Sequence, residues 1–163
     1  WMLKQNEKLK DGTPKKSSFY ELKRGDLEPA NNTLLKYHSE YHYVFQKLYD
    51  FNTKNNLTLD ESFTLANAAR RVLESFSAFK KPNESGMQGV LNLAKTKGID
   101  SNVTDKIYYF LNKYSHLDRI ETFENTIENI ENEGSVIAGE ILNIISTIDP
   151  DHFSSMETIC KKN

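Results

Sequence analysis

Arg70, Glu74 and His116 are the residues of this chain whose types could together perform acid–base chemistry on a phosphodiester. Arg70 and Glu74 lie four residues apart, so they share one face of a predicted helix and can form an ion pair. His116 lies at the predicted end of another helix, where the helix dipole favours the protonated imidazole. In one cleft, the imidazole could move the proton of a 2′-hydroxyl or of the leaving oxygen, and the guanidinium could neutralise charge on phosphorus. The carboxylate could orient the guanidinium or act as the partner acid or base. Such a set could cleave RNA without a metal ion.

The same three residues also have a purely structural interpretation. Arg70 and Glu74 could form a pair on a solvated helix face, and His116 could stabilise the end of its helix. Spacing alone favours this structural interpretation. Arg71 lies one position round the helix from Arg70 and is available to solvent or to an anion.

Other motifs carry weaker signals. His38 and His42 are four residues apart, but no third ligand accompanies them, so no metal site is predicted. The sequence contains neither G-x-x-x-x-G-K-[ST] nor G-x-G-x-x-G, so this segment cannot bind ATP in the P-loop manner. Cys160 is the single cysteine, which excludes an internal disulfide and points to a reducing compartment, the cytoplasm.

Charge and hydropathy restrict the partners. A formal net charge of −2 gives no reason to expect DNA or an anionic membrane. Residues 1–24 carry seven Lys and Arg against three acids, whereas residues 118–140 carry seven acids against Arg119 alone. No apolar run approaches the roughly 18 residues that span a bilayer, and the N-terminus has no signal-peptide core.

The hydrophobic pattern predicts a mainly α-helical protein with one short N-terminal strand. The strand is expected over residues 18–23, and its partners should lie outside this sequence. Asp60 is a plausible N-cap for a long helix that ends before Pro82. The apolar stripe of that helix is expected to comprise Phe63, Ala66, Ala69, Val72 or Leu73, Phe76 and Phe79. Helices are predicted at residues 1–10, 31–51, 61–80, 85–97, 101–115, 120–132 and 135–148, with a short segment after Pro150.

Three sequence blocks resemble a known family. Tyr41–Phe45, Asn67–Lys80 and Tyr114–His116 resemble the C-terminal region of bacterial ABC-type AAA ATPases related to the PrrC and RloC anticodon nucleases. The resemblance runs from about residue 19 to 156. It implies that residues 1–28 are the tail end of an ATPase head and that residues 29–163 form a C-terminal, HEPN-like helical bundle. A chain that begins at Trp1 fits the expectation of a piece of a larger protein.

The resemblance also implies a function. In that family an Arg-x-x-x-Glu pair and a distant His are the catalytic triad, which here implies Arg70, Glu74 and His116. The HEPN signature has an Arg or Asn a few residues before the His, where Asn112 is the only candidate and Lys113 lies beside it; with Arg71 they are the expected substrate-binding residues.

The expected protein is an ATP-driven antiviral defence factor whose tail is a tRNA or RNA endoribonuclease. ATP and Mg are expected at the head alone, and a homo-oligomer is expected through it. The alternative is a non-catalytic interaction or dimerisation module that docks a separate effector.

Overall fold

The computed structural model describes residues 20–29, 37, 39–54, 57–115 and 123–162. The chain divides into two compact units, Trp1–Glu40 and Tyr41–Asn163. The helix expected at residues 1–10 lies outside the described residues, as do His38, His116 and most of the range 30–38.

The described part of the first unit is a two-stranded antiparallel hairpin. Strand β1 (Tyr20–Lys23) pairs with β2 (Asp26–Pro29), and Leu22 lies opposite Leu27. Arg24 and Gly25 both have positive φ angles, 51° and 95°. Positive φ at both central residues is the requirement of a two-residue type I′ turn, which matches the twist of the paired strands.

The hairpin confirms the expected strand but corrects the expectation about its partner. The sequence assigned Arg24, Gly25 and Asp26 to the boundary of a lone strand, whereas the structure continues directly into β2. The second strand was missed because Asp and Pro are rare in strand interiors. An isolated two-stranded hairpin is marginally stable in water, so these strands need further packing.

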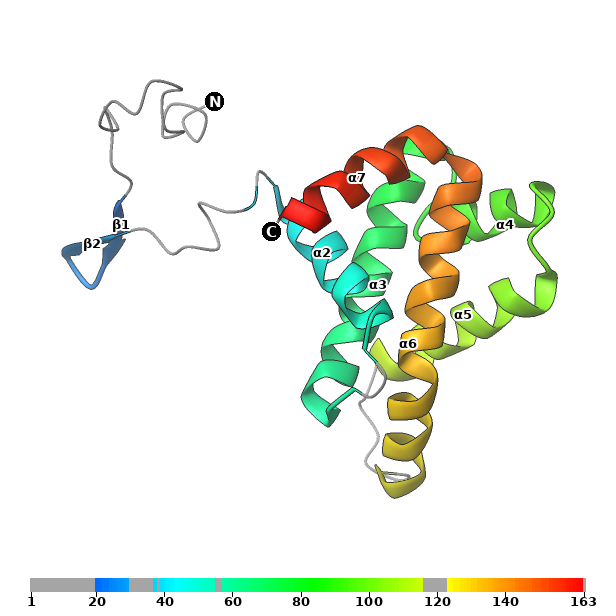
Figure 1. Cartoon of the computed structure of the whole chain (residues 1–163), viewed down its shortest axis with the longest axis horizontal. Helices are drawn as coiled ribbons and strands as arrows, with labels where there is room; N and C mark the ends of the chain where they lie inside the picture. The colour runs from blue at the N-terminus through cyan, green and yellow to red at the C-terminus, as the bar shows by residue number, and fades with distance from the viewer. Residues whose placement is uncertain (1–19, 30–36, 38, 55–56, 116–122, 163) are drawn as a thin grey trace. The chain divides into compact units, whose positions relative to one another are not determined.

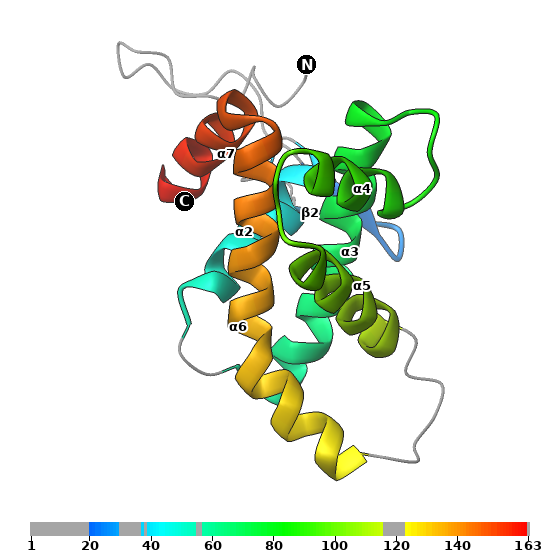
Figure 2. The ribbon, with the colours of Figure 1, turned by 90° about the vertical axis from the view of Figure 1, so that its right-hand side faces the viewer.

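The second unit is entirely α-helical in its described residues (Figure 1). Its helices are α2 (Glu40–Asn52), α3 (Leu59–Lys80), α4 (Gln88–Thr96), α5 (Ser101–Ser115), α6 (Phe123–Ile148) and α7 (Pro150–Lys162). Helix α3 contacts α4, α5 and α6, and α6 also contacts α7. Helices α3 and α6 run side by side in the same direction (Figures 1 and 2).

The ends of α3 follow from local chemistry. Its N-cap is Thr58, whose hydroxyl accepts a hydrogen bond from the backbone N–H of Glu61, while the Glu61 side chain accepts one from the backbone N–H of Thr58. This capping box replaces the Asp60 cap expected from sequence, because the Thr–x–x–Glu pair satisfies two N–H groups instead of one. The helix ends at Lys80, before Pro82, as predicted.

Helix α6 is continuous where the sequence predicted two helices separated near residue 134. A Cβ atom on Gly134 would lie 2.7 Å from Cδ1 of Leu57 and 2.9 Å from Cδ2 of Leu65. Glycine therefore lets α6 approach the start of α3 closely, and it does not mark a break. The packing of a neighbouring segment overrides the intrinsic helix preference at this position.

The core lies along one face of α3, as the apolar spacing predicted. Ala66, Ala69, Val72, Leu73 and Phe76 are buried, together with Ile107 and Leu111 of α5 and Ile137, Ile141 and Ile144 of α6. Full burial of a large apolar side chain contributes about 1.5–3 kcal/mol. Phe79 departs from the expected stripe: it is 83% exposed, whereas Ser77 in the same last turn of α3 is buried, so Phe79 faces away from the packed core.

The segment after Pro150 is a full helix that packs on the core through Met156 and Cys160. Asp149 precedes it and accepts a hydrogen bond from the backbone N–H of His152 at 3.0 Å, which caps the first turn. Asp149 also forms an ion pair with Lys80 at the end of α3. Among the described residues, no helix is both long and apolar enough to cross a membrane.

His152 lies in an aromatic environment that joins α7 to α2 and α3. Its Nε2 is linked to the Tyr41 hydroxyl by a hydrogen bond of 2.8 Å, and its ring centroid lies 5.4 Å from that of Phe76 and 6.4 Å from that of Phe45. Burial lowers the pKa of the His152 imidazole; the carboxylate of Asp149 opposes this shift, and Lys80 and His42 add to it.

We expect the stability of the helical unit to fall as the pH drops below about 6.5, the ordinary pKa of histidine. The unfolded chain then binds a proton that the folded His152 resists, so the free energy of unfolding decreases with falling pH until the folded-state pKa is passed. The free energy of unfolding of the His152→Gln variant, measured by urea denaturation, should fall less between pH 7 and pH 5.5 than that of the wild type. The His42→Gln variant should keep most of the loss. Equal pH dependence in wild type and His152→Gln would contradict this assignment.

Candidate functional site

Arg70 and Glu74 form the ion pair that their spacing predicted. Nε of Arg70 donates to Oε1 of Glu74 at 2.8 Å. Both residues are held outward on α3 because the neighbouring positions Val72 and Leu73 are buried in the core. The side chains are 30% and 39% exposed, so the pair lies at the surface with about two thirds of its area covered by protein.

Arg70 also joins α3 to the end of α5. Its Nη1 donates to the hydroxyl oxygen of Ser115 at 3.2 Å, and that hydroxyl donates to the backbone carbonyl of Leu111 one turn earlier. Ser115 is the last residue of α5 and directly precedes His116 in the sequence. Arg70, which binds Glu74, therefore contacts the residue that precedes the third expected catalytic residue in the sequence. His116 itself lies outside the described residues.

The expected substrate-binding residues lie in the middle of α3 and in the last turn of α5. Arg71 is exposed on α3, and Lys113 is exposed in the last turn of α5 beside the half-buried Asn112. Nζ of Lys113 lies 5.0 Å from the ring centroid of Tyr114, within the range of a cation–π contact. Arg71 therefore follows Arg70 on α3, and Asn112 and Lys113 lie within one turn of Ser115 on α5.

A pocket of about 420 Å³ lies between α5 and α6, and sequence reasoning did not identify it. It is lined by Lys106, Tyr109, Phe110, Lys113, Tyr114 and Glu133. The signal was available, because Lys106, Tyr109 and Lys113 are spaced by three and four residues. Sequence reasoning missed the pocket because Tyr109 lies outside the apolar stripe of α5, where a tyrosine resembles any other surface residue.

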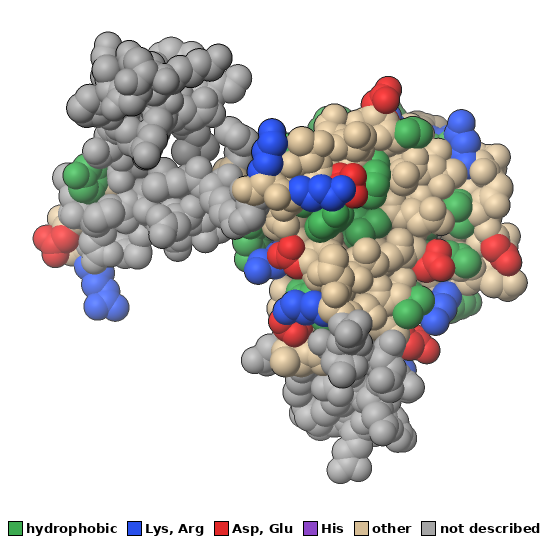
Figure 3. Space-filling model, in the orientation of Figure 1, with side chains coloured by type: hydrophobic (Ala, Val, Ile, Leu, Met, Phe, Trp, Pro, Cys, Tyr) green, Lys and Arg blue, Asp and Glu red, His purple; other side chains and the backbone are tan. Residues whose placement is uncertain are grey.

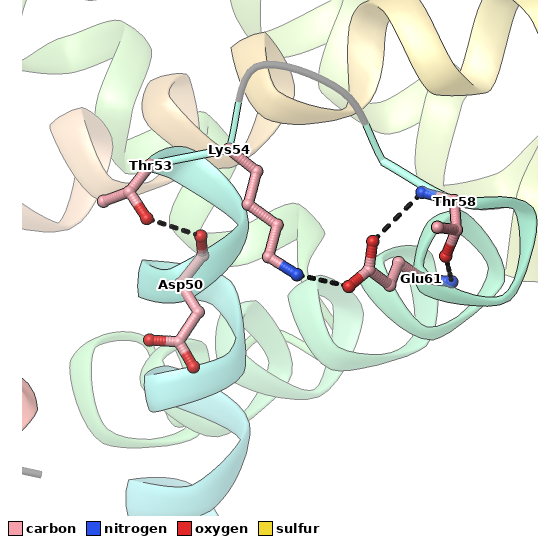
Figure 4. Close-up of polar contacts among 5 residues, drawn as sticks. All are labelled: Asp50, Thr53, Lys54, Thr58 and Glu61. Carbon is pink, nitrogen blue, oxygen red and sulfur yellow. Dashed lines mark hydrogen bonds and ion pairs between the residues drawn. The ribbon is translucent and has the colours of Figure 1, made fainter.

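A second pocket, of about 560 Å³, lies between α2 and the start of α3 and includes Tyr43, Lys47, Asp50, Phe51 and Thr64. Figure 4 shows how its rim is organised: Lys54 reaches Glu61, which also receives the Thr58 backbone N–H, and Thr53 donates to the carbonyl of Asp50. The hydrogen bond from Lys54 is the main cause that lowers the pKa of Glu61 to about 2. This rim therefore stabilises the start of α3, and the charges of Lys54 and Glu61 on it neutralise each other.

Cys160 lies in an environment that does not activate its thiol. Burial raises the pKa of the Cys160 thiol to about 11, which keeps it protonated and poorly nucleophilic at neutral pH. Within the described ranges, no three His, Cys, Asp or Glu side chains gather where they could hold a metal ion. His42 is part of these ranges and His38 is not.

Acidic and basic side chains are interspersed on the visible face of the helical unit (Figure 3). Several of them are matched in pairs, such as Lys95 with Asp105 at 2.8 Å and Lys161 with Glu157 at 2.9 Å. The basic segment 1–24 falls mostly outside the described residues, and of the acidic segment 118–140 the structure describes the side chains of residues 133–140. On the described surface, local groups rather than a large single-sign field must therefore attract a charged ligand.

The sequence of the chain matches one known protein family. A family model described as an AAA domain matches residues 2–143 of the 163 residues. The chain belongs to this family, which confirms the AAA ATPase part of the resemblance. No curated protein and no solved structure matches the chain.

We expect the Arg70–Glu74 pair to contribute little to folding. An i,i+4 ion pair at a solvent-accessible surface contributes about 0.3–0.5 kcal/mol, so Glu74→Gln should lower the free energy of unfolding by less than about 1 kcal/mol. Urea denaturation measures this directly, with Glu157→Gln, which disrupts the comparable Lys161–Glu157 pair on α7, as the matched control. A loss several times larger than in the control would assign Glu74 a primarily structural role.

Proposed function

We propose that this AAA ATPase-associated region is the C-terminal effector of an ATP-driven bacterial anti-phage protein and acts as a metal-independent endoribonuclease on tRNA or another RNA. The observation that supports this proposal is the Arg70 guanidinium, which contacts both Glu74 and the residue that precedes His116. In the proposal the bundle is a HEPN-like domain related to the anticodon nucleases, and an ATPase head of the same protein binds ATP and Mg and assembles the oligomer.

The three residues have separate tasks in the proposed reaction. His116 removes the proton from a ribose 2′-hydroxyl, or delivers a proton to the leaving 5′-oxygen. The 2′-oxygen attacks phosphorus as the bond to the 5′-oxygen breaks, which leaves a 2′,3′-cyclic phosphate and a 5′-hydroxyl. Arg70 neutralises the charge that develops on the phosphoryl oxygens. Glu74 orients Arg70, a role that the 2.8 Å bond to Nε supports.

A second candidate is a non-catalytic module that packs or dimerises the ATPase head or docks a separate effector. The contact between Arg70 and Ser115 also supports this second candidate, because it joins α3 to α5 as a structural interaction would. The partial exposure of Arg70 and Glu74 favours the nuclease, since a purely structural network could be buried completely. Variants of His116 and Arg70 separate the two candidates.

We expect His116→Ala to lose cleavage by at least about a hundredfold, the usual contribution of a general acid or base. The substrate is a bulk tRNA pool in EDTA, and mapping of the new ends should show cyclic phosphates in the wild type alone. The thermal unfolding midpoint should stay close to that of the wild type, because an imidazole that exchanges protons with a substrate must be accessible and contributes little to the core. Equal cleavage by both proteins would remove His116 from the site. If neither cleaves, even when the assay is repeated without EDTA and with the ATPase head, ATP and Mg present, the module is favoured.

We expect Arg70→Lys to reduce cleavage by tenfold or more while the chain stays folded. An ammonium is a point charge that cannot reproduce the planar guanidinium, which here must hold Glu74 and Ser115 in two directions while it faces phosphate. The comparison is Arg71→Lys, whose exposed position predicts a smaller effect that is confined to KM. Wild-type turnover in Arg70→Lys would contradict its proposed role.

A further inference from the structure

The exposed edge of α5 combines cationic and aromatic side chains in one line. Lys106, Tyr109 and Lys113, here named the α5 strip, are spaced by three and four residues and therefore lie on one helix face. They line the pocket of about 420 Å³ together with Phe110, Tyr114 and Glu133. This volume is in the range of small-ligand pockets and can hold a nucleoside-sized group.

Tyr109 offers an accessible aromatic ring. Its side chain is 72% exposed, although aromatic rings usually lose most of their surface on folding. Tyr108 contacts it edge to face, with ring centroids 6.0 Å apart and planes at 74°. Beneath the strip, Phe110 and Tyr114 pack with centroids 4.7 Å apart and give the pocket an apolar floor. A flat ring above such a floor suits the stacking of an unpaired base.

The two lysines of the strip flank the tyrosine and remain available to an anion. Lys106 is 3.8 Å from Glu133, the outer limit of an ion pair, and both side chains are about half exposed, at 49% and 45%. Lys113 contacts the ring of Tyr114 and forms no ion pair with the part of the chain that the structure describes. Seven residues of helix place the two lysines roughly 10 Å apart along the axis. Their charge complements successive phosphates, which favours a nucleic acid over a protein surface of mixed charge.

We propose that the α5 strip binds single-stranded RNA, with a base stacked on Tyr109 and phosphates on Lys106 and Lys113. The choice of RNA rests on the proposed function. The strip ends at Lys113 in the last turn of α5, and the same turn contains Ser115, the partner of Arg70. Residues two apart on a helix point to different sides, so the strip and Ser115 use separate faces of this turn. A strand bound along the strip would have to cross from this face of α5 to the face of Ser115 to reach the Arg70–Glu74 pair, so the strip would hold the substrate without taking part in the chemistry.

Binding is measured by fluorescence anisotropy of a labelled, mixed-sequence single-stranded RNA with the His116→Ala variant, so that cleavage cannot interfere. Adding Tyr109→Leu should weaken binding about tenfold or more, because the aliphatic side chain has no ring to stack on a base. Tyr109→Phe should retain near-normal affinity. Tyr43→Leu is the matched control: Tyr43 is also an exposed tyrosine beside a lysine, Lys47, but it lies on α2, and its loss should not change binding.

Salt dependence tests the lysines separately. Lys106→Gln and Lys113→Gln should each lower the slope of log affinity against log salt by about 0.7, the value for one phosphate contact on a single strand. Unchanged slopes in both variants would overturn the phosphate assignment.

The proposal is overturned if the His116→Ala protein binds no RNA, or if Tyr109→Leu binds as tightly as its parent. It is also overturned if Tyr109→Leu dissociates a dimer of this chain in sedimentation experiments without changing RNA affinity, because the face would then be a protein interface. Failure of the nuclease looks different: RNA binding depends on Tyr109, yet the wild type does not cleave. Conversely, cleavage with a KM that is insensitive to Tyr109→Leu retains the nuclease and removes the strip.

Discussion

The apolar face of α3 is the constraint on which the helical unit depends. This helix contacts α4, α5 and α6, and its residues Leu65, Val72, Leu73 and Phe76 are almost completely buried. Because burial is roughly proportional to stabilisation, a helix in contact with three others fixes their positions more strongly than any surface ion pair can. The capping box at Thr58 and Glu61 fixes where α3 begins, and Gly134 allows α6 to approach its first turns. Any chemistry in the unit must use the positions that this packing leaves exposed.

The rotation of α3 about its axis explains why Arg70 and Glu74 meet Ser115. With Val72 and Leu73 turned into the core, residues 70 and 74 are placed at the border between the buried and the solvated face. Helix α5 packs on α3 through its own buried residues Ile107 and Leu111, and its last turn thereby reaches Arg70. The polar contact follows from the apolar packing and does not cause it. A site assembled in this way costs the fold little, because its residues contribute few buried atoms.

Periodicity predicted most of this helical architecture, and its failures have physical causes. The spacing of apolar residues predicted α3 and α5 closely, because each buries a stripe that repeats every three or four residues. Gly134 was misread as a break, and Phe79 as core, because both depend on which neighbouring helix is present, information that local sequence does not contain. The hairpin partner Asp26–Pro29 was missed since its composition is typical of turns. The Arg70–Glu74 bond could be predicted from four-residue spacing, whereas the bond from Arg70 to Ser115 spans 45 residues and depends on tertiary packing.

Helix α5 is the element that links the core, the candidate catalytic pair and the basic-aromatic edge. Its buried side anchors it, one end contacts Arg70, and its outer edge carries Lys106, Tyr109 and Lys113. From Lys106 to Ser115 a helix rises roughly 13 Å, a distance that backbone hydrogen bonds hold constant. The chain belongs to the AAA domain family, and this segment contains no P-loop sequence. A ligand held along a rigid helix would keep a fixed register with respect to Arg70, and such positioning is the part of catalysis that a packed helical scaffold supplies best.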